Sequence, residues 1–169
     1  MATTFELISS VTVGAGGTST ISFTSIPTTY TDLCLELSAR SAYSGALEGI
    51  VFRFNNDTDA GHYAHRRLYG SGSSAVSDTS AAPLFVNSST STSNTFGNLA
   101  VYIPNYAGST AKSWSADLVQ ENNATAAYAA IVAGFYNQTT ALSRIDMSLE
   151  NADNFLQYTT AYLYGVKNA

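Results

Sequence analysis

The residues best suited to chemistry lie in one short stretch, where both histidines of the chain stand beside two arginines. His62 and His65 are three positions apart and are followed directly by Arg66 and Arg67. Two imidazoles at this spacing could share a transition metal, but such a site needs further ligands, and the adjacent guanidinium groups oppose a cation. We interpret the stretch, with Arg53 as a further member, as a small basic patch. Contact with an acidic partner surface and a solvated turn both remain open for it.

Residues 55–61 read Asn-Asn-Asp-Thr-Asp-Ala-Gly and are rich in the oxygen ligands that calcium prefers. The stretch departs from the EF-hand template, because its glycine comes one place late and Arg66 stands where the bidentate acid belongs. A calcium site of another kind stays open, and an Asx-rich turn between two strands is the simpler interpretation. We predict neither a metal ion nor a cofactor.

Catalytic patterns are missing from the sequence. There is no Gly-x-Ser-x-Gly elbow, and 22 serines make any single serine uninformative. Cys34 lies opposite Leu33 and Leu35 in an alternating strand, which favours a small buried side chain over a nucleophile. A glycosidase needs two converging carboxylates, and the pair to test is Asp57 and Asp59. We predict that the protein is not an enzyme.

Eleven tyrosines form a second candidate for binding. Tyr102 and Tyr106 flank Pro104, and others lie near the C-terminus. A large ring with a polar tip suits protein interfaces and sugar-binding surfaces. The same side chains could instead line the edge of a core with their hydroxyls bonded to the backbone, and the sequence leaves both readings open.

The composition restricts the classes of partner. Only 11% of the 169 residues are charged and the net charge is −5, whereas 22 serines and 20 threonines dominate the polar residues. Seven cations are too few for a nucleic-acid binder. Dense charge for a coiled coil is also missing, while 45% hydrophobic residues suffice for a core. We expect hydroxyls and amides at the outward strand positions.

Alternation of apolar and polar residues at every second position is the dominant pattern and predicts strands. Nine to ten strands are expected, over 5–13, 18–24, 31–40, 49–55, 95–103, 111–120, 126–136, 141–150 and 158–167, with a short one at 83–86. In 5–13, the apolar residues Phe5, Leu7, Val11 and Val13 are expected on one side. The alanine-rich 126–136 is interpreted as a strand buried on both faces, and 62–69 as a helical turn or a short strand.

These elements predict one domain over 1–169, because this length buries a single core. Many short alternating strands favour an all-β, antiparallel β-sandwich, and long crossing connections favour a jelly-roll-like arrangement. The remainder of 70–94, rich in serine and threonine, is expected to form a long surface loop.

The compartment is constrained by what precedes Arg40, the first basic residue. A secretory signal begins with basic residues, so none is expected. The longest nearly apolar run, 126–136, is too short for a membrane helix, and the single Cys34 excludes an intramolecular disulfide. We expect folding in a cytoplasm, with neither membrane nor nucleic acid as partner.

Several residue strings occur together in a characteristic order. They are Phe5-Glu6-Leu7-Ile8, Phe23-Thr24-Ser25-Ile26-Pro27-Thr28-Thr29-Tyr30-Thr31-Asp32-Leu33, Phe52-Arg53-Phe54-Asn55-Asn56-Asp57-Thr58, Asn94-Thr95-Phe96, Val101-Tyr102-Ile103-Pro104-Asn105-Tyr106, Glu121-Asn122-Asn123 and Leu163-Tyr164-Gly165-Val166. This order resembles small virion structural proteins of tailed bacteriophages, frequent among marine and cyanobacterial phages. The resemblance covers nearly the whole chain and carries no catalytic residues.

The resemblance implies a non-enzymatic virion component, foremost a capsid decoration (cement) protein on the outer surface of the head. Its partners would be the major capsid protein and copies of itself, as a homotrimer, in a virion assembled in the host cytoplasm. A tail- or fibre-attached module that binds a receptor or glycan is the alternative, and a polysaccharide depolymerase is a third. The candidate partner contacts are Arg53, His62, His65, Arg66, Arg67, Tyr102 and Tyr106.

Overall fold

The computed structural model describes residues 4–122 and 126–167, so Asn123 of one quoted string lies outside it. Twelve strands are found in the described residues: β1 (Phe5–Thr12), β2 (Thr20–Thr24), β3 (Asp32–Ala39), β4 (Leu47–Phe54), β5 (Tyr63–Gly70), β6 (Ala75–Asp78), β7 (Leu84–Asn87), β8 (Gly97–Pro104), β9 (Lys112–Asn122), β10 (Ala126–Tyr136), β11 (Arg144–Leu149) and β12 (Thr160–Val166). A single 3-10 turn described among them, η1 (Ala60–His62), precedes β5. The described residues contain no helix long and apolar enough to cross a membrane.

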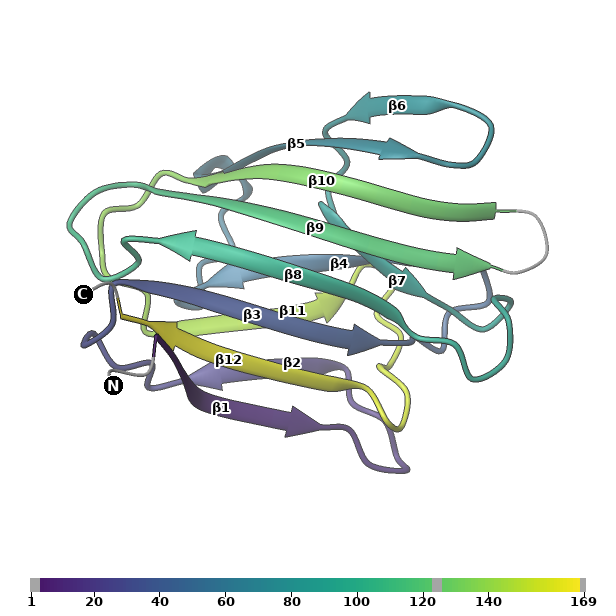
Figure 1. Cartoon of the computed structure of the whole chain (residues 1–169), viewed down its shortest axis with the longest axis horizontal. Helices are drawn as coiled ribbons and strands as arrows, with labels where there is room; N and C mark the ends of the chain where they lie inside the picture. The colour runs from purple at the N-terminus through teal and green to yellow at the C-terminus, as the bar shows by residue number, and fades with distance from the viewer. Residues whose placement is uncertain (1–3, 123–125, 168–169) are drawn as a thin grey trace.

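The strands form two stacked sheets, which confirms the predicted antiparallel β-sandwich. The larger sheet has the order β1-β12-β3-β8-β9-β10-β5-β6 and the smaller one β2-β11-β4-β7. Figure 1 places the larger sheet in front and the smaller one behind it. Consecutive strands from β1 to β5 change sheet at every connection. These crossings give the sandwich its jelly-roll-like character.

The core lies between the sheets and comes from the alternating residues that the sequence singled out. Because successive side chains of a strand point to opposite faces, each strand supplies every second residue. The predicted inward residues of β3, β4, β9 and β11 are all buried: Leu33, Leu35, Leu37, Ile50, Phe52, Phe54, Trp114, Ala116, Leu118, Ile145, Met147 and Leu149.

Two strand predictions were wrong about which side chains are buried. β10 was expected to be buried on both faces, yet it buries only alternate residues such as Val132, and Ile131 is 61% exposed. In β1 the register shifts between Leu7 and Ser9. This bulge turns Val11 towards the core while Leu7 faces solvent.

The segment 70–94 includes the short strand expected at 83–86, found as β7, but its remainder is not one long surface loop. It contains β6, which pairs with β5, and β7, which pairs with β4. All four residues of β7 are buried. The alternative of a short strand for 62–69 is confirmed by β5, which follows η1 directly.

A buried arginine holds the chain that leads from β7 to β8. Arg40, 7% exposed, donates from Nη1 to the carbonyl oxygens of Thr92 (2.8 Å) and Thr95 (2.9 Å). Its Nη2 donates to the carbonyl oxygens of Ser89 (3.2 Å) and Ser91 (3.0 Å). One guanidinium therefore satisfies four backbone acceptors in a segment that lacks strand pairing.

The single tryptophan depends on a glycine in the neighbouring strand. Trp114 of β9 is opposite Gly134 of β10, which is opposite His65 of β5. A Cβ atom on Gly134 would lie 1.9 Å from Cε2 of Trp114. The indole therefore lies directly over the backbone of β10, where no side chain fits.

Replacing Gly134 with alanine should force the indole away. We expect Gly134→Ala to lower the free energy of unfolding by about 1–3 kcal/mol, as overpacking does, and to shift the emission of the single tryptophan. Urea unfolding followed by fluorescence measures both. Gly70→Ala is the matched control, since nothing lies within 4 Å of the added Cβ. Equal stability of the two variants would contradict this packing.

Replacing Arg40 with leucine should remove the side-chain donor from the carbonyl groups of Ser89, Ser91 and Thr95, whereas that of Thr92 keeps the N–H and hydroxyl donors of Thr95. We expect Arg40→Leu to cost about 3 kcal/mol or more, since each unsatisfied buried acceptor costs about 1–3 kcal/mol. Urea denaturation measures this loss. Arg66→Leu, at an exposed arginine, should change stability by less than about 0.5 kcal/mol. A loss below about 1 kcal/mol for Arg40→Leu would refute the role assigned to the guanidinium.

Candidate functional site

The predicted basic patch is divided by the alternation of β5. His65 and Arg67 lie on the side of β5 that faces the smaller sheet, together with Tyr63 and Tyr69, which pack against the core. Arg66 lies on the outer side and is exposed. Adjacent arginines in a strand point to opposite faces, so Arg66 and Arg67 do not form one surface.

The charge of Arg67 is neutralised inside the molecule. Its Nε lies 2.6 Å from Oδ1 of Asp78, and its Nη2 lies 3.1 Å from Oδ2. Its Nη1 donates to the carbonyl oxygen of Ala82 (3.1 Å), and its guanidinium lies over the rings of Tyr69 and Phe85. The hydrogen bonds from Arg67 lower the pKa of Asp78. Arg67 therefore fastens β6 and β7 to β5.

His65 and Arg53 are also engaged within the fold. The Nε2 atom of His65 is hydrogen-bonded to the carbonyl oxygen of Ser80. The guanidinium carbon of Arg53 lies 5.0 Å from the centre of the Tyr63 ring, a cation–π arrangement. His65 thereby links β5 to the segment between β6 and β7, and Arg53 links β4 to β5.

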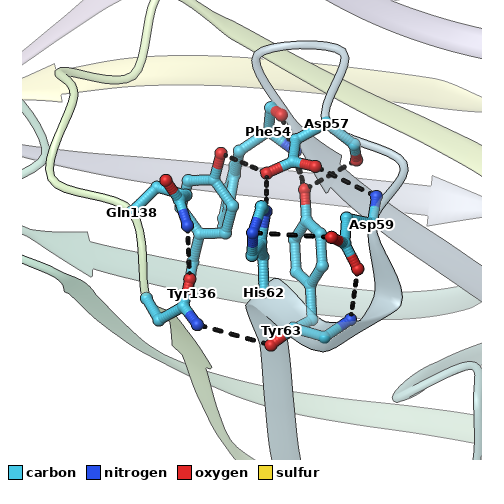
Figure 2. Close-up of polar contacts among 9 residues, drawn as sticks. Phe54, Asp57, Asp59, His62, Tyr63, Tyr136 and Gln138 are labelled. Carbon is cyan, nitrogen blue, oxygen red and sulfur yellow. Dashed lines mark hydrogen bonds and ion pairs between the residues drawn. The ribbon is translucent and has the colours of Figure 1, made fainter.

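The fifth member of the predicted patch, His62, belongs to a polar cluster at the turn between β4 and β5 (Figure 2). His62 Nδ1 lies 2.6 Å from Oδ2 of Asp57, and the hydroxyl of Tyr136 donates to the same oxygen at 3.0 Å. The Tyr63 hydroxyl donates to the carbonyl oxygen of Asp57 (3.0 Å) and accepts from the N–H of Phe54 (3.0 Å). The carboxylate of Asp57 therefore joins η1 to β10, and the hydroxyl of Tyr63 joins β5 to β4 and to the Asp57 backbone.

Charge and burial set the ionisation of this cluster. The hydrogen bond from His62 lowers the pKa of Asp57, and burial raises the pKa of Tyr136 and that of Tyr63. Oδ1 of Asp57 accepts from the N–H of Asp59 at 3.0 Å, and Oδ1 of Asp59 accepts from the N–H of Gly61 at 2.8 Å. The Asx-rich turn expected for residues 55–61 is therefore confirmed. Within the described residues, no three His, Cys, Asp or Glu side chains are grouped so that they could hold a metal ion.

A cavity of about 240 Å³ lies next to this cluster. Its lining includes Arg53, Tyr63, His65, Pro83 and Trp114. It lies beside the part of β4 that β7 does not cover, since β7 pairs only with Leu47–Ile50 of β4. Aromatic rings beside a guanidinium and an imidazole can hold a small polar ligand by stacking and hydrogen bonding.

The two tyrosines singled out by the sequence have different surroundings. Tyr106 is fully buried, and its hydroxyl donates to the carbonyl oxygen of Pro27, so it is not a surface contact. Tyr102 is 39% exposed on the outer face of the larger sheet, and its hydroxyl donates to Oδ2 of Asp32. Cys34 lies on the same face and is only partly buried, unlike the buried side chain expected. Burial and the nearby Glu36 raise its pKa to about 11, which disfavours a reactive thiolate.

The outer face of the larger sheet carries a set of exposed apolar side chains, of which the sequence pointed only to Tyr102 and the tyrosines near the C-terminus. Nine large hydrophobic side chains are exposed in the described residues, and all except Tyr158 lie on the outer face of the larger sheet: Phe5, Leu7, Leu68, Tyr102, Val119, Ile131, Phe135 and Tyr162. The expectation of hydroxyls and amides at outward positions holds for Asn98, Ser113 and Ser115 of this face but was wrong for these eight residues. A signal did exist, since 126–136 is apolar at both parities. It was interpreted as burial on both faces instead of an exposed apolar side.

The comparisons with known proteins add little to this picture. No protein-family model matches the sequence, and no curated protein matches it. Among solved structures, the crystal structure of Caenorhabditis elegans galectin LEC-6 is similar, with a TM-score of 0.35, 11% identity, and coverage of 94% of this chain and 96% of that chain. A TM-score this low carries no information about ligand or partner. The resemblance to phage virion proteins stays a prediction.

The Asp57 cluster makes a prediction about pH. A carboxylate whose native pKa is lowered stabilises the fold above its unfolded pKa of about 3.9, and this contribution is lost as the pH falls through the native value. We expect Asp57→Asn to be less stable than the wild type at neutral pH, with the difference shrinking below about pH 4. Urea midpoints across a pH series measure it. Asp117→Asn, at an exposed carboxylate, is the control, and a difference independent of pH would contradict the prediction.

Proposed function

We propose that this chain is a non-enzymatic virion structural protein, foremost a capsid decoration protein that binds the outer surface of a phage head. The observation that carries the proposal is the outer face of the eight-stranded sheet, on which the exposed large hydrophobic side chains gather. A concentration of exposed apolar side chains on one face of a folded domain typically marks a protein interface. The proposed role requires such a surface, because a cement protein stabilises a shell only by burying area against it.

We assign shell binding to the part of this face formed by β1 and β12. Phe5 and Leu7 of β1 are 51% and 55% exposed, and Phe5 packs edge-on against Tyr164 of β12. Tyr162 and Tyr164 are stacked beside them. Aromatic side chains with few charges are typical of the centre of an interface. Glu36 of β3 is exposed on the same face, opposite Tyr162.

Asp57 and Asp59, the carboxylate pair named for a depolymerase, are engaged within the fold. A depolymerase needs two carboxylates free to face a sugar. Asp57 is bound by His62 and Tyr136, and Asp59 caps η1 through the N–H of Gly61. These two carboxylates support the turn between β4 and β5, so they are poorly placed to act as an acid and base pair.

The second candidate function is a tail- or fibre-attached module that binds a glycan or receptor. The cavity lined by Arg53, Tyr63, His65 and Trp114 favours it, because such residues can contact a sugar ring. The number of copies per particle separates the two roles. A decoration protein requires copies over the whole head, whereas a tail- or fibre-attached module requires few.

The decoration role is tested on particles prepared with and without this protein. We expect particles that carry it to expand or burst at higher temperature, because binding to the assembled shell stabilises that state. Light scattering during heating measures this temperature. Leu7→Ser combined with Tyr162→Ser should weaken binding to bare shells by about tenfold or more, as loss of interface hot spots does. Tyr158→Asn, at an exposed residue outside the face, is the control. Equal heat stability with and without the protein would exclude a cement role.

A further inference from the structure

We propose that the part of the outer face formed by β5, β10 and β9 binds a second copy of this chain. Strands β5, β10 and β9 would pair with the same strands of the second copy about a two-fold axis that runs along β10. Arg66 of each copy would then pair with Asp117 of the other. This proposal goes beyond the proposed function: it takes up the self-association that the resemblance implied and gives a pair in place of the homotrimer. It does not depend on binding to a shell.

The surface concerned has a ridge with a hollow on each side. Leu68 of β5 is opposite Ile131 of β10, and both are about half exposed. Surface hollows of about 470 Å³ and about 440 Å³ adjoin these two residues. The hollows lie over small residues, Ala129 on one side and Ala133 on the other. A flat polar sheet face would have neither ridge nor hollow.

The register makes this surface complementary to itself. A two-fold axis along β10 lays β5 of one copy over β9 of the other. A β5 residue then faces the β9 residue that is opposite the same residue of β10. Val119 and Gly70 both flank Ala129, so Val119 then meets the gap at Gly70 of the second copy. Arg66 and Ser115 both flank Ala133, so the arginine stem meets the small serine. Between these two positions, Ile131 of one copy meets Ile131 of the other across the axis, and Leu68 lies over Asp117 of the second copy, so large side chains oppose small ones at the heights of Ala129 and Ala133 only.

The charges are complementary under the same operation. Arg66 and Asp117 are exposed on this face, and neither makes an ion pair within the described part of the chain. They belong to β5 and β9, which are two strand spacings or about 10 Å apart. The two-fold axis places Arg66 over Ser115 of the second copy, two residues or about 7 Å along the strand from its Asp117. An extended arginine side chain spans that distance, so the dimer contains two equivalent Arg66–Asp117 ion pairs.

The overlap has the size of a weak but specific interface. In the proposed pair, the strands β6, β5, β10, β9 and β8 of one copy lie over β8, β9, β10, β5 and β6 of the other. Five strands at about 4.8 Å spacing and about 25 Å length bury about 1,200 Å² in total, the lower end for specific complexes. Strands β3, β12 and β1 stay uncovered, so the surface proposed for the shell remains free in the pair.

Sedimentation velocity on the purified full chain tests the proposal. We expect the mass to rise from one chain to two across a concentration series. Arg66→Asp and Asp117→Arg should each weaken association by about tenfold or more, because like charges then face each other. An equimolar mixture of these two variants should associate again, since every Asp–Arg contact between the unlike copies is restored. Ile131→Asp should abolish association, and Tyr158→Asn should leave it unchanged.

A single mass at all concentrations, a mass of three chains, or a mixture that stays monomeric would overturn the proposal. So would single charge variants that associate like the wild type. Circular dichroism confirms that each variant is folded, which is expected at these exposed positions. The shell-binding experiment is separate: pairing in solution without binding to shells would refute the decoration role alone, and binding by a strictly monomeric chain would refute the pair alone.

Discussion

The unequal size of the two sheets is the constraint on which the rest of the structure depends. Four strands cannot cover the inner face of eight, so the strands beyond the small sheet must be covered by other parts of the chain. At β5 this cover is the turn that carries Asp57 and the chain around Ser80 and Ala82. The polar side chains of β5 on that side, including His65 and Arg67, bond to this covering chain. Residues that look like a binding patch in the sequence therefore hold the edge of the sandwich together.

Several of the few cations in the chain act as internal hydrogen-bond donors. Arg40 and Lys112 are buried and bond to backbone carbonyl oxygens rather than to carboxylates. Buried carbonyl groups outside the strands need donors, and an arginine or lysine supplies several from one side chain. Arg66 is different, since it is exposed and makes no ion pair in the described chain. A cation left unpaired on an apolar face favours an intermolecular role for it.

The outer face of the large sheet connects fold and function. A sandwich needs only the inner side of each sheet to be apolar, so hydrophobic residues at outward positions do not serve the core. Leu68, Ile131 and Phe135 at one end and Leu7 at the other are such residues. The two ends are separated by β8 and β3, whose outward positions include Cys34, Glu36 and Asn98. This separation allows one end to bind a second copy while the other binds a different protein, as an assembly component would require.

The sequence by itself determined the fold class and most of the core, because the period-two alternation of strands such as β3 and β9 specifies which side chains face inward. It also predicted the Asx-rich turn at 55–61, since aspartates bond to nearby backbone N–H groups wherever the chain turns. Tertiary structure alone decided the rest. Whether an apolar strand face is covered depends on the extent of the opposite sheet, so the exposure of Ile131 could not be read from local pattern. Asp78 reaches Arg67 through the register in which β6 pairs with β5, and Asp57 reaches His62 through the turn between β4 and β5. The bulge after Leu7 reverses the faces of β1 through its pairing with β12, a contact between opposite ends of the chain.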